Sequence, residues 1–318
     1  MKSVLVTGGA GFIGSHVTRT LSERGDSVVI IDNFNDYYDP QIKEDRISVF
    51  LKEYNPTLYR VDFSEREALI PLFQKHQFDS IVHLGARAGV RASIEDPYIY
   101  TQANVFGTLN ILEMARQFKV PQVVLASTSA VYGGNKKIPF SETDPVDKPI
   151  SPYAATKKAT ELMAYTYHHL HKLQCTCLRF FTVYGPWGRP DMALFKFTKN
   201  ILADQPIDIY NNGKHQRDFT YIDDIVAGIL AAVDNPFPYE IINLGNSHTE
   251  DLLHFIEIIE QVLGKKARRN LLPMQPGDVE KTYADITKAK QLLHFEPKTR
   301  IDEGIKNFIN WYREYYHS

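Results

Sequence analysis

The sequence has few of the features on which several protein classes depend. Only two of its 318 residues are cysteines, Cys175 and Cys177, too few for a disulfide scaffold or a cysteine-rich metal site. The 36 Lys and Arg residues nearly balance the 38 Asp and Glu residues, for a formal charge of −2. This balance provides no broad cationic field, so neither nucleic acid nor an anionic membrane is expected as a partner.

Long apolar runs are also missing from the sequence. No stretch approaches the roughly 20 apolar residues that cross a bilayer. Residues 1–6 lead straight into a glycine cluster, which leaves no room for the core of a signal peptide. Hydrophobic residues make up 43% and charged residues 23% of the chain, as is ordinary for a globular protein. We therefore expect a cytoplasmic globular protein, long enough for about two lobes.

The first half of the chain alternates short apolar runs with longer amphipathic segments. The apolar runs predict strands at residues 3–7, 27–32, 58–62, 80–84, 122–127 and 176–181. Helices are predicted between them at residues 11–23, 66–75, 100–118 and 153–173. Strands that are apolar on both faces and separated by helices are typical of a parallel sheet covered on both sides. The predicted fold is therefore a doubly wound α/β sheet of the Rossmann type.

This alternation ends near residue 182, where a loop rich in Gly and Pro begins. A predicted helix at 221–233 and a predicted strand at 240–244 could return to the sheet. We therefore expect a Rossmann domain at 1–182, with 217–246 returning to it. Residues 183–216 and 247–318 would form a smaller, discontinuous lobe.

Three further features are expected to be structural. The two cysteines stand two apart in an apolar run, as core residues on one face of a strand do. His168, His169 and His171 lie on the polar side of a predicted helix with no fourth ligand nearby, so no metal site is expected. The aromatic segment 311–316 is typical of an amphipathic helix that docks on the smaller lobe.

A glycine cluster follows the first predicted strand and opens the first helix. In Thr7-Gly8-Gly9-Ala10-Gly11-Phe12-Ile13-Gly14, the glycines at 8, 11 and 14 suit a tight turn, a close approach to pyrophosphate, and close helix–sheet packing. Free N–H groups at the start of the helix would then meet the phosphates. Glycine clusters also occur in ordinary loops, so the motif depends on its context.

That context includes an acidic residue. The next strand ends at Asp32, 18 residues beyond Gly14, where a carboxylate can accept hydrogen bonds from the ribose hydroxyls of adenosine. Asp32 would repel a 2′-phosphate, and neither Asn33 nor Phe34 is a cation that could hold one. The alternative is an Asp that merely caps a turn. Strand, glycines, helix and acid together favour NAD over NADP as a cofactor.

Tyr153 and Lys157 stand four positions apart in a predicted helix and so share one face of it. A neighbouring cation stabilises a phenolate, so Lys157 is expected to lower the pKa of Tyr153 and make it a usable base. The pair lies downstream of Thr128, at the carboxyl edge of the sheet where doubly wound folds bind ligands. Without that context, such a pair is usually a solvated helix face.

In these motifs the chain resembles the extended short-chain dehydrogenase/reductase family, and within it the nucleotide-sugar epimerases. The resemblance covers nearly the whole chain. It is carried by the glycine motif, Asp32-Asn33, His83-Leu84-Gly85-Ala86, Thr128, the Tyr153/Lys157 pair and Arg217-Asp218-Phe219-Thr220. Gly85 stands where relatives often have Ala, a small departure. Three segments most resemble UDP-glucuronate 4-epimerases: residues 87–91, 182–192 and 276–279.

The resemblance implies an enzyme with bound NAD⁺ that inverts C4 of UDP-glucuronate to give UDP-galacturonate. Tyr153 would take the proton of the 4-hydroxyl while hydride leaves C4 for the nicotinamide, and the 4-keto sugar would turn over before hydride returns. Lys157 would hold the nicotinamide ribose, and Thr128 would bridge to O4. The cofactor would be lined by Gly8, Gly11, Phe12, Ile13, Gly14, Asp32, Asn33, Asp62, Phe63, Leu84, Ala86, Asn104, Tyr153, Lys157 and Phe181.

The substrate's carboxylate separates the candidate reactions. Oxidation at C4 of a hexuronate gives a β-keto acid, which loses carbon dioxide readily. We hypothesise that Thr182, Ser129 and Arg189 hold the carboxylate so that its C–C bond lies away from the carbonyl π system. Related dehydratases carry Asp-Glu after the threonine, and decarboxylases a Glu in the second place, whereas this chain has Ser129-Ala130. UDP-glucose 4-epimerase is the nearest alternative, followed by UDP-glucuronate decarboxylase.

Three residues are candidates for the nucleotide. Arg217 resembles the pyrophosphate-binding arginine of the family, and a surface salt bridge with Asp218 is the alternative. Asp278 would accept from the uridine ribose, or else cap a turn. Arg91 would face the substrate, or else pair with Glu95 on a helix. The smaller lobe would thus bind the nucleotide sugar.

The resemblance also bears on assembly and on a rival class of function. The helices at 100–118 and 153–172 resemble those through which relatives form homodimers as a four-helix bundle, so a homodimer is expected. The rival is an NAD-sensing protein that has kept the fold without the chemistry. Such a protein would be expected to lose part of the glycine motif or the Tyr/Lys pair, and this chain keeps both.

Overall fold

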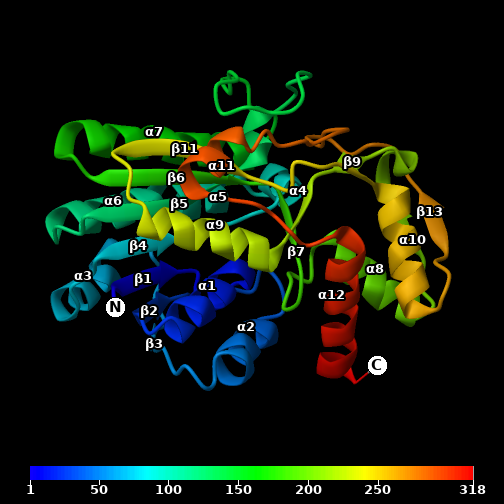
Figure 1. Ribbon diagram of the computed structural model, residues 1–318, viewed down its shortest axis with the longest axis horizontal. Helices are drawn as coiled ribbons and strands as arrows, with labels where there is room; N and C mark the ends of the chain where they lie inside the picture. Colours follow the sequence, from blue (N-terminus) through cyan, green and yellow to red (C-terminus); the bar gives the residue numbers. More distant parts are fainter. Residues whose placement is uncertain (318) are drawn as a thin grey trace.

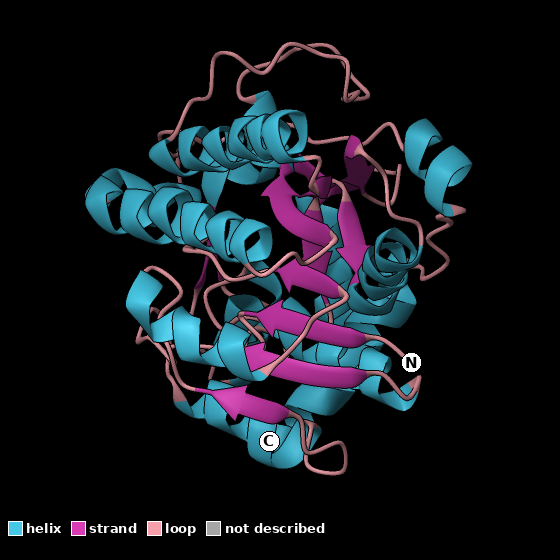
Figure 2. Cartoon of the chain, turned by 90° about the vertical axis from the view of Figure 1, so that its left-hand side faces the viewer, coloured by secondary structure: helices cyan, strands magenta, loops and turns pink. Residues whose placement is uncertain are grey.

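The computed structural model describes residues 1–317, and a seven-stranded sheet forms its centre (Figures 1 and 2). All neighbouring strands of this sheet are parallel. In spatial order they are β11 (Tyr239–Leu244), β6 (Gln174–Phe180), β5 (Gln122–Thr128), β4 (Ser80–His83), β1 (Ser3–Thr7), β2 (Ser27–Ile31) and β3 (Thr57–Tyr59). The predicted doubly wound α/β fold is confirmed, and the strand order reverses between β1 and β4, where such folds bind ligands.

Each face of the sheet has its own hydrophobic core, because successive strand residues point to opposite faces. Val4 and Val6 of β1 belong to one buried cluster, and Leu5 between them belongs to the other. Cys175 and Cys177 both lie in the second cluster, as predicted. The first face is covered by α1 (Phe12–Glu23) and α9 (Ile222–Asp234), and the second by α3 (Arg66–Lys75), α6 (Gly107–Gln117) and α7 (Pro152–His171).

Some predicted boundaries differ from the structure. The strand predicted at 58–62 ends at Tyr59, which leaves Asp62 in the following loop. The helix predicted at 100–118 consists of α5 (Pro97–Tyr100), the π-helical turn η2 (Thr101–Phe106) and α6. It begins early because Pro97 suits a first helical position and Asp96 accepts a hydrogen bond from the Ile99 N–H (3.3 Å). Before β6, four short elements have no counterpart in the prediction: α2 (Gln41–Asp45), the π-helical turn η1 (Arg46–Phe50), α4 (Val90–Glu95) and the 3₁₀ turn η3 (Ser129–Tyr132).

A smaller lobe lies at the right of Figure 1. Its helices are α8 (Ala193–Leu202), α10 (Leu252–Leu263) and α12 (Ile301–Tyr316). Short strands pair beside them: β7 (Thr182–Tyr184) with β10 (Phe219–Tyr221), β8 (Ile207–Ile209) with β13 (Arg269–Leu271), and β9 (Gln216–Arg217) with β12 (Glu250–Asp251). The 3₁₀ turn η4 (Tyr210–Gly213) follows β8, and α11 (Thr287–Leu293) packs against β11 and α9 at the main sheet.

The aromatic end of the chain forms the predicted amphipathic helix on this lobe. In α12 the buried positions recur every three or four residues: Ile301, Gly304, Ile305, Phe308, Ile309 and Tyr312. The helix packs against α10. At Gly304 an added Cβ would lie 2.3 Å from the Tyr184 hydroxyl, so only glycine allows this close approach of α12 to β7.

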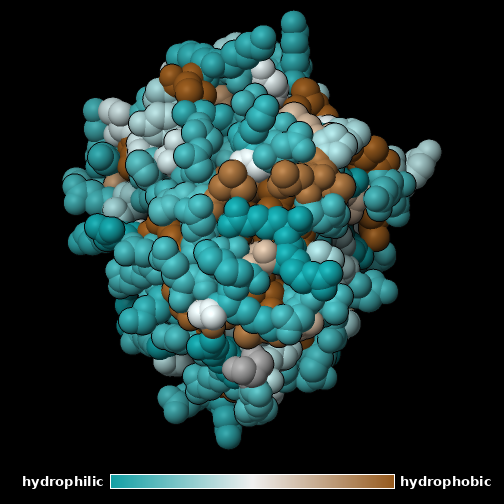
Figure 3. Space-filling view, turned by 90° about the vertical axis from the view of Figure 1, so that its right-hand side faces the viewer, coloured by the Kyte–Doolittle hydropathy of each residue, from teal (hydrophilic) through white to brown (hydrophobic). Residues whose placement is uncertain are grey.

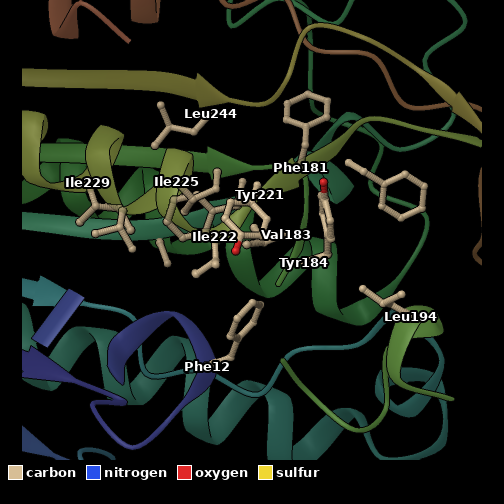
Figure 4. Close-up of a cluster of buried hydrophobic side chains, with 14 of the residues drawn as sticks. Phe12, Phe181, Val183, Tyr184, Leu194, Tyr221, Ile222, Ile225, Ile229 and Leu244 are labelled. Carbon is tan, nitrogen blue, oxygen red and sulfur yellow. The ribbon is translucent and has the colours of Figure 1, made fainter. Parts of the chain in front are cut away.

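One continuous core joins the two lobes. Figure 4 shows Ile222, Ile225 and Ile229 of α9 near Phe12 of α1 on one side, and Tyr184 and Leu194 of the smaller lobe on the other. All these side chains are buried in the same cluster. Among residues 1–317, no helix combines the length and the apolar character that crossing a membrane requires.

Candidate active site

A cavity of about 480 Å³ opens at the carboxyl ends of the central strands, where the two lobes meet. It is lined by the turn between β1 and α1, by the residues that follow β2, β4 and β5, by α7, and by the segment 180–192. Most of the predicted site residues lie on its wall: Gly8, Gly11, Phe12, Ile13, Gly14, Asp32, Asn33, Asp62, Phe63, Leu84, Ala86, Thr128, Ser129, Tyr153, Lys157, Phe181, Thr182 and Arg189. Asn104, Arg91, Arg217 and Asp278 are not part of that wall.

The glycine turn leaves space that only glycine can provide. Gly8 has a φ of +67°, and a Cβ there would lie 2.9 Å from the backbone of Gly85. A Cβ at Gly14 would lie 2.1 Å from the Gly8 carbonyl oxygen. Helix α1 begins immediately afterwards, and no side chain caps its N-terminus. Its first N–H groups therefore face the cavity without a side-chain partner, and the turn fits the pyrophosphate of a dinucleotide.

Asp32 stands beside this turn, almost fully buried. Its carboxylate accepts hydrogen bonds from the N–H groups of Ala10 (3.1 Å) and Phe34 (2.9 Å). Asp32 thus caps the turn after β2, as the alternative interpretation had it, and it also lines the cavity, while its contact with a ribose stays a prediction. Burial raises the pKa of Asp32, while these hydrogen bonds and the nearby Lys43 oppose the rise.

Lys43 is a cavity residue that the sequence reasoning missed. It lies on α2, is 4% exposed, and donates to the Asn35 carbonyl oxygen (2.7 Å). Burial lowers its pKa to about 8, with the charge of Asp32 acting in the opposite direction. The sequence reasoning considered only Asn33 and Phe34, neither of which is a cation, whereas the short helix α2 brings this amine back from position 43.

Thr128, Tyr153 and Lys157 come together at the inner end of the cavity, as their predicted roles require. Thr128 ends β5, and its hydroxyl accepts a hydrogen bond from the Ala130 N–H (3.2 Å). Tyr153 lies in the first turn of α7, where Ser151 caps the helix by accepting from the Ala154 N–H (3.2 Å). Lys157 follows one turn later and is 2% exposed.

The prediction that the pKa of Tyr153 is lowered is wrong for the protein without bound ligands. Burial raises the pKa of the Tyr153 phenol above its ordinary value, and the Thr128 hydroxyl and the Arg189 guanidinium oppose the rise only in part. Burial likewise lowers the pKa of Lys157 to about 8. A site of low polarity disfavours the charged form of both groups. The prediction was based on the spacing of four residues alone and left this desolvation out of account.

A buried ion pair between Glu161 and Arg179 supports the helix that carries Tyr153 and Lys157, and the sequence reasoning missed it. Glu161 lies one turn after Lys157 on α7, and its carboxylate accepts hydrogen bonds from the Ser127 hydroxyl (2.7 Å) and from Arg179 (2.8 and 2.9 Å). Both charged side chains are almost completely buried. The only available signal was an arginine inside an otherwise apolar strand. The pair fixes α7 against the ends of β5 and β6.

Asn104 supports the cavity without lining it. Its amide donates to the Arg87 carbonyl oxygen (3.0 Å) and to the Thr156 hydroxyl (3.0 Å), and its oxygen accepts from the Arg87 N–H (2.8 Å). Both amide donors are thus used within the protein. In the protein alone Asn104 has a structural role, in which η2 holds the loop after β4, and its contact with a cofactor stays a prediction.

Arg189 lines the cavity but already has an acidic partner. Asp191 accepts two hydrogen bonds from it, at 2.9 and 2.6 Å. Its guanidinium also donates to the Ala88 carbonyl oxygen (3.3 Å) and lies 5.6 Å from the centre of the Tyr37 ring. Ser129 and Thr182 place two further polar side chains on the same cavity wall.

The three predicted nucleotide residues form a separate charged cluster. Asp278 accepts a hydrogen bond from Arg217 (2.9 Å), and Arg91 approaches its other oxygen at 3.7 Å. The alternative partners predicted for the two arginines, Asp218 for Arg217 and Glu95 for Arg91, are wrong. Asp218 is fully buried and accepts from backbone N–H groups of other loops, and no ion pair joins Arg91 to Glu95 in the part of the chain that the structure describes. Arg91 stacks instead 4.6 Å from the ring centre of Tyr210.

Over residues 1–317 there is no group of three or more His, Cys, Asp or Glu side chains that could hold a metal ion. The donors that line the cavity are backbone N–H groups, hydroxyls, the phenols of Tyr37, Tyr38 and Tyr153, side-chain amides and several cations. This set suits a ligand with phosphates and hydroxyl groups.

Comparison with known proteins gives consistent matches. Residues 4–245 match the model of the NAD dependent epimerase/dehydratase family. The chain is 48% identical over 315 residues to a UDP-glucuronate 4-epimerase of Thermodesulfobacterium geofontis, covering 99% of this chain and 97% of that one. The structure is similar to UDP-glucuronic acid 4-epimerase from Bacillus cereus in complex with UDP-glucuronic acid and NAD (TM-score 0.92, 34% identity, 99% and 100% coverage). It is also similar to UDP-glucose 4-epimerase from Thermotoga maritima (TM-score 0.90, 31% identity, 99% coverage of both chains).

Proposed function

The chain belongs to the NAD dependent epimerase/dehydratase family, and we propose on that basis that it interconverts UDP-glucuronate and UDP-galacturonate by inversion at C4. One observation carries the proposal: Thr128, Tyr153 and Lys157 share a cavity with a glycine turn that fits a dinucleotide. The near full-length similarity to UDP-glucuronate 4-epimerases supports the choice of sugar.

The cofactor is NAD, which when bound supplies a hydride acceptor and, once reduced, the donor that returns the hydride. The glycine turn and the N-terminus of α1 would hold its pyrophosphate, and Asp32 its adenosine ribose. Asn33, Asp62, Phe63, Leu84, Ala86 and Phe181 would complete the wall around it.

Tyr153 would take the proton from the 4-hydroxyl of the sugar and give it back after the 4-keto sugar has turned over. Thr128 would hold O4 beside the phenol, since both side chains line the same part of the cavity. Lys157, protonated below about pH 8, would favour the phenolate and hold the nicotinamide ribose. The buried Glu161–Arg179 ion pair would keep α7 fixed against the ends of β5 and β6.

The carboxylate of the sugar would be held by Ser129 and Thr182, with the Arg189–Asp191 pair closing the same side of the cavity. Held so that its C–C bond lies near the plane of the C4 carbonyl and does not overlap the carbonyl π system, the carboxylate could not leave as carbon dioxide. Ser129-Ala130 offers no carboxyl group for eliminating water. These residues favour epimerisation over decarboxylation and dehydration.

The UDP group would lie at the edge of the lobe of residues 183–216 and 247–318, where Asp278 of that lobe meets Arg217 and Arg91. Arg217 and Arg91 would face the diphosphate, and Asp278 would accept from the uridine ribose. Each arginine lies within 4 Å of the Asp278 carboxylate in the free protein. Arginine suits this role because its planar guanidinium can bind two phosphate oxygens at once.

We further propose that the enzyme is a homodimer of the cytoplasm. Helix α7 exposes Leu162 and Tyr165, three positions apart on one face, and η2, packed beside it, exposes Phe106. Large exposed side chains that lie together are typical of an interface. By contrast, the face over the smaller lobe is mainly hydrophilic with scattered hydrophobic residues (Figure 3). The two buried cysteines are free, which fits a reducing compartment.

The test is to incubate the protein with UDP-glucuronate, without and with added NAD⁺, and to identify products by anion-exchange chromatography and mass. A galacturonate product of equal mass is expected. A product lighter by carbon dioxide would favour the decarboxylase, and turnover of UDP-glucose alone would favour the neutral-sugar epimerase.

Thr182→Ala should lower kcat/KM for UDP-glucuronate by roughly 10- to 100-fold, as loss of a hydrogen bond to a charged group does, and should release some carbon dioxide. Thr182→Ser, which keeps the hydroxyl, is the matched control. An unchanged product and unchanged uronate binding in Thr182→Ala would remove this role.

A further inference from the structure

Arg46 is a fully buried cation whose direct contacts are all uncharged. Its guanidinium is 0% exposed, and within residues 1–317 no carboxylate lies at ion-pair distance from it, although the charge of Asp32 acts on it from farther away. All its hydrogen bonds go to uncharged oxygens: the Tyr38 hydroxyl (2.9 Å) and the carbonyls of Ala10 (3.1 Å), Trp187 (2.7 and 3.2 Å) and Gly188 (3.3 Å). Burying a charge in this way is costly unless something compensates it.

These carbonyls belong to the two parts of the cavity that different ligands would contact. Ala10 lies inside the glycine turn, between Gly8 and Gly14. Trp187 and Gly188 lead directly into Arg189, on the sugar side of the cavity. One guanidinium, in a fixed planar geometry, thus joins the backbone of the cofactor turn to the backbone of the substrate segment.

The substrate segment, residues 187–189, is strained at the joint where its backbone meets Arg46. Trp187 has a φ of +58°, a left-handed conformation that is rare for a bulky residue and persists only where its surroundings enforce it. Arg46 holds its carbonyl, while its ring packs against Phe50, Trp311 and Tyr315 with centroids 5.0 to 5.4 Å away. The segment therefore has a restrained conformation that depends on Arg46.

We propose that Arg46 is a positioning residue that couples the two ligands, so that a dinucleotide on the glycine turn and a UDP-sugar beside Arg189 strengthen each other's binding. The inference rests on the proposed function, because it takes the two ligands from it. A pyrophosphate on the turn adds negative charge near the buried guanidinium, where Asp32 provides the only carboxylate whose charge is seen to act on it within residues 1–317, and this favours the arrangement in which Arg46 fixes both loops. Such coupling is reciprocal.

The test measures NAD⁺ binding to the full chain by equilibrium dialysis, with and without saturating UDP-glucuronate. The wild-type protein should bind NAD⁺ more tightly with UDP-glucuronate present, by a factor in the usual allosteric range of roughly 5 to 150. In Arg46→Gln the two affinities should become nearly equal. Tyr315→Phe is the matched control, because it alters the same joint without touching the glycine turn, and it should keep the wild-type ratio.

Tryptophan emission provides a second readout, since both tryptophans of the chain, Trp187 and Trp311, lie at this joint. NAD⁺ should shift the emission of the wild-type protein, and bound NAD⁺ should shift that of Arg46→Gln much less. Arg46→Lys, which keeps the charge but not the planar fork, should bind NAD⁺ yet still lose the coupling, and it serves where Arg46→Gln does not fold.

A wild-type ratio near one, or an unchanged ratio in both Arg46 variants, would overturn the proposal. Because no turnover is measured, this result is independent of whether UDP-glucuronate is epimerised. Coupling without epimerisation would instead count against the proposed reaction alone.

Discussion

At the scale of single residues, burial has opposite effects on the two groups that would move the proton. It raises the pKa of the Tyr153 phenol and lowers the pKa of the Lys157 ammonium to about 8. Each neutral form is thus favoured in the protein alone, and a phenolate needs positive charge close to it. Lys157 and an oxidised nicotinamide would both supply such charge, so the reactive state of Tyr153 depends on the loaded cavity.

Tyr153→Phe should lower kcat by about 10²- to 10⁴-fold, because it removes the phenol that lies beside Thr128 and is assigned to transfer the 4-hydroxyl proton. NAD and UDP binding should remain close to wild type, since the ring still fills its place. The measurement is turnover of UDP-glucuronate together with affinity for both nucleotides. Tyr54→Phe, which removes a hydroxyl bound to Glu23 outside the cavity, should keep full activity. Turnover retained in Tyr153→Phe would refute the assigned role.

Lys157 should limit activity on the alkaline side. Its pKa is lowered to about 8, so its positive charge is present below that pH and is lost as pH rises through it. The rate constant kcat/KM should therefore fall above about pH 8, well below the value of about 10.4 for an ordinary lysine. The measurement is a pH–rate profile, with the affinity for UDP followed in parallel. A profile that stays flat to about pH 10 would contradict the assignment.

At the scale of elements, Asp218 connects β9 and β10 to loops that are distant in the sequence. Its carboxylate accepts from the N–H groups of Asn246 (2.7 Å), Ser247 (3.1 Å) and Ala284 (3.0 Å). These loops follow β11 and precede α11. A single buried carboxylate thus fixes three chain segments next to the cluster of Arg217 and Asp278.

Asp218→Ala should reduce the free energy of unfolding by roughly 3 kcal/mol or more, because it leaves buried N–H groups without an acceptor, at about 1–3 kcal/mol each. Urea denaturation followed by circular dichroism would measure the change. Asp208→Ala, at an exposed position of β8, is the control and should change stability little. A loss below about 1 kcal/mol in Asp218→Ala would mean that water replaces the carboxylate.

At the scale of the whole molecule, one chain supplies every residue assigned to the cavity, so each protomer should be able to act alone. The exposed residues Leu162 and Tyr165 lie on the outer face of α7, whereas Tyr153 and Lys157, on the same helix, face the cavity. Association through that face would therefore stabilise α7 without closing the cavity.

Leu162→Glu should convert a dimer into a monomer, because a charge would be buried in an apolar interface. Sedimentation velocity or light scattering would show the change in mass. Leu271→Glu, at a similarly exposed position of the smaller lobe, should stay dimeric. A wild-type protein that is monomeric at micromolar concentration, or a Leu162→Glu protein that remains a dimer, would refute the proposed interface.

The sequence by itself determined the sheet, the glycine turn and the helix with Tyr153 and Lys157. These depend on local patterns: short continuous apolar runs separated by amphipathic helices, glycines where a Cβ would clash, and a spacing of four on a helix. The prediction of α12 succeeded for the same reason, since its buried positions repeat every three or four residues.

Only the tertiary structure decided which charges meet. Lys43 reaches Asp32 because α2 folds back, and Arg46 reaches Trp187 across 141 positions of sequence. Glu161 pairs with Arg179, and Asp278 rather than Asp218 pairs with Arg217. Contacts between distant segments, and the desolvation that shifts the pKa values of Tyr153 and Lys157, depend on packing in three dimensions, which no local spacing along the chain encodes.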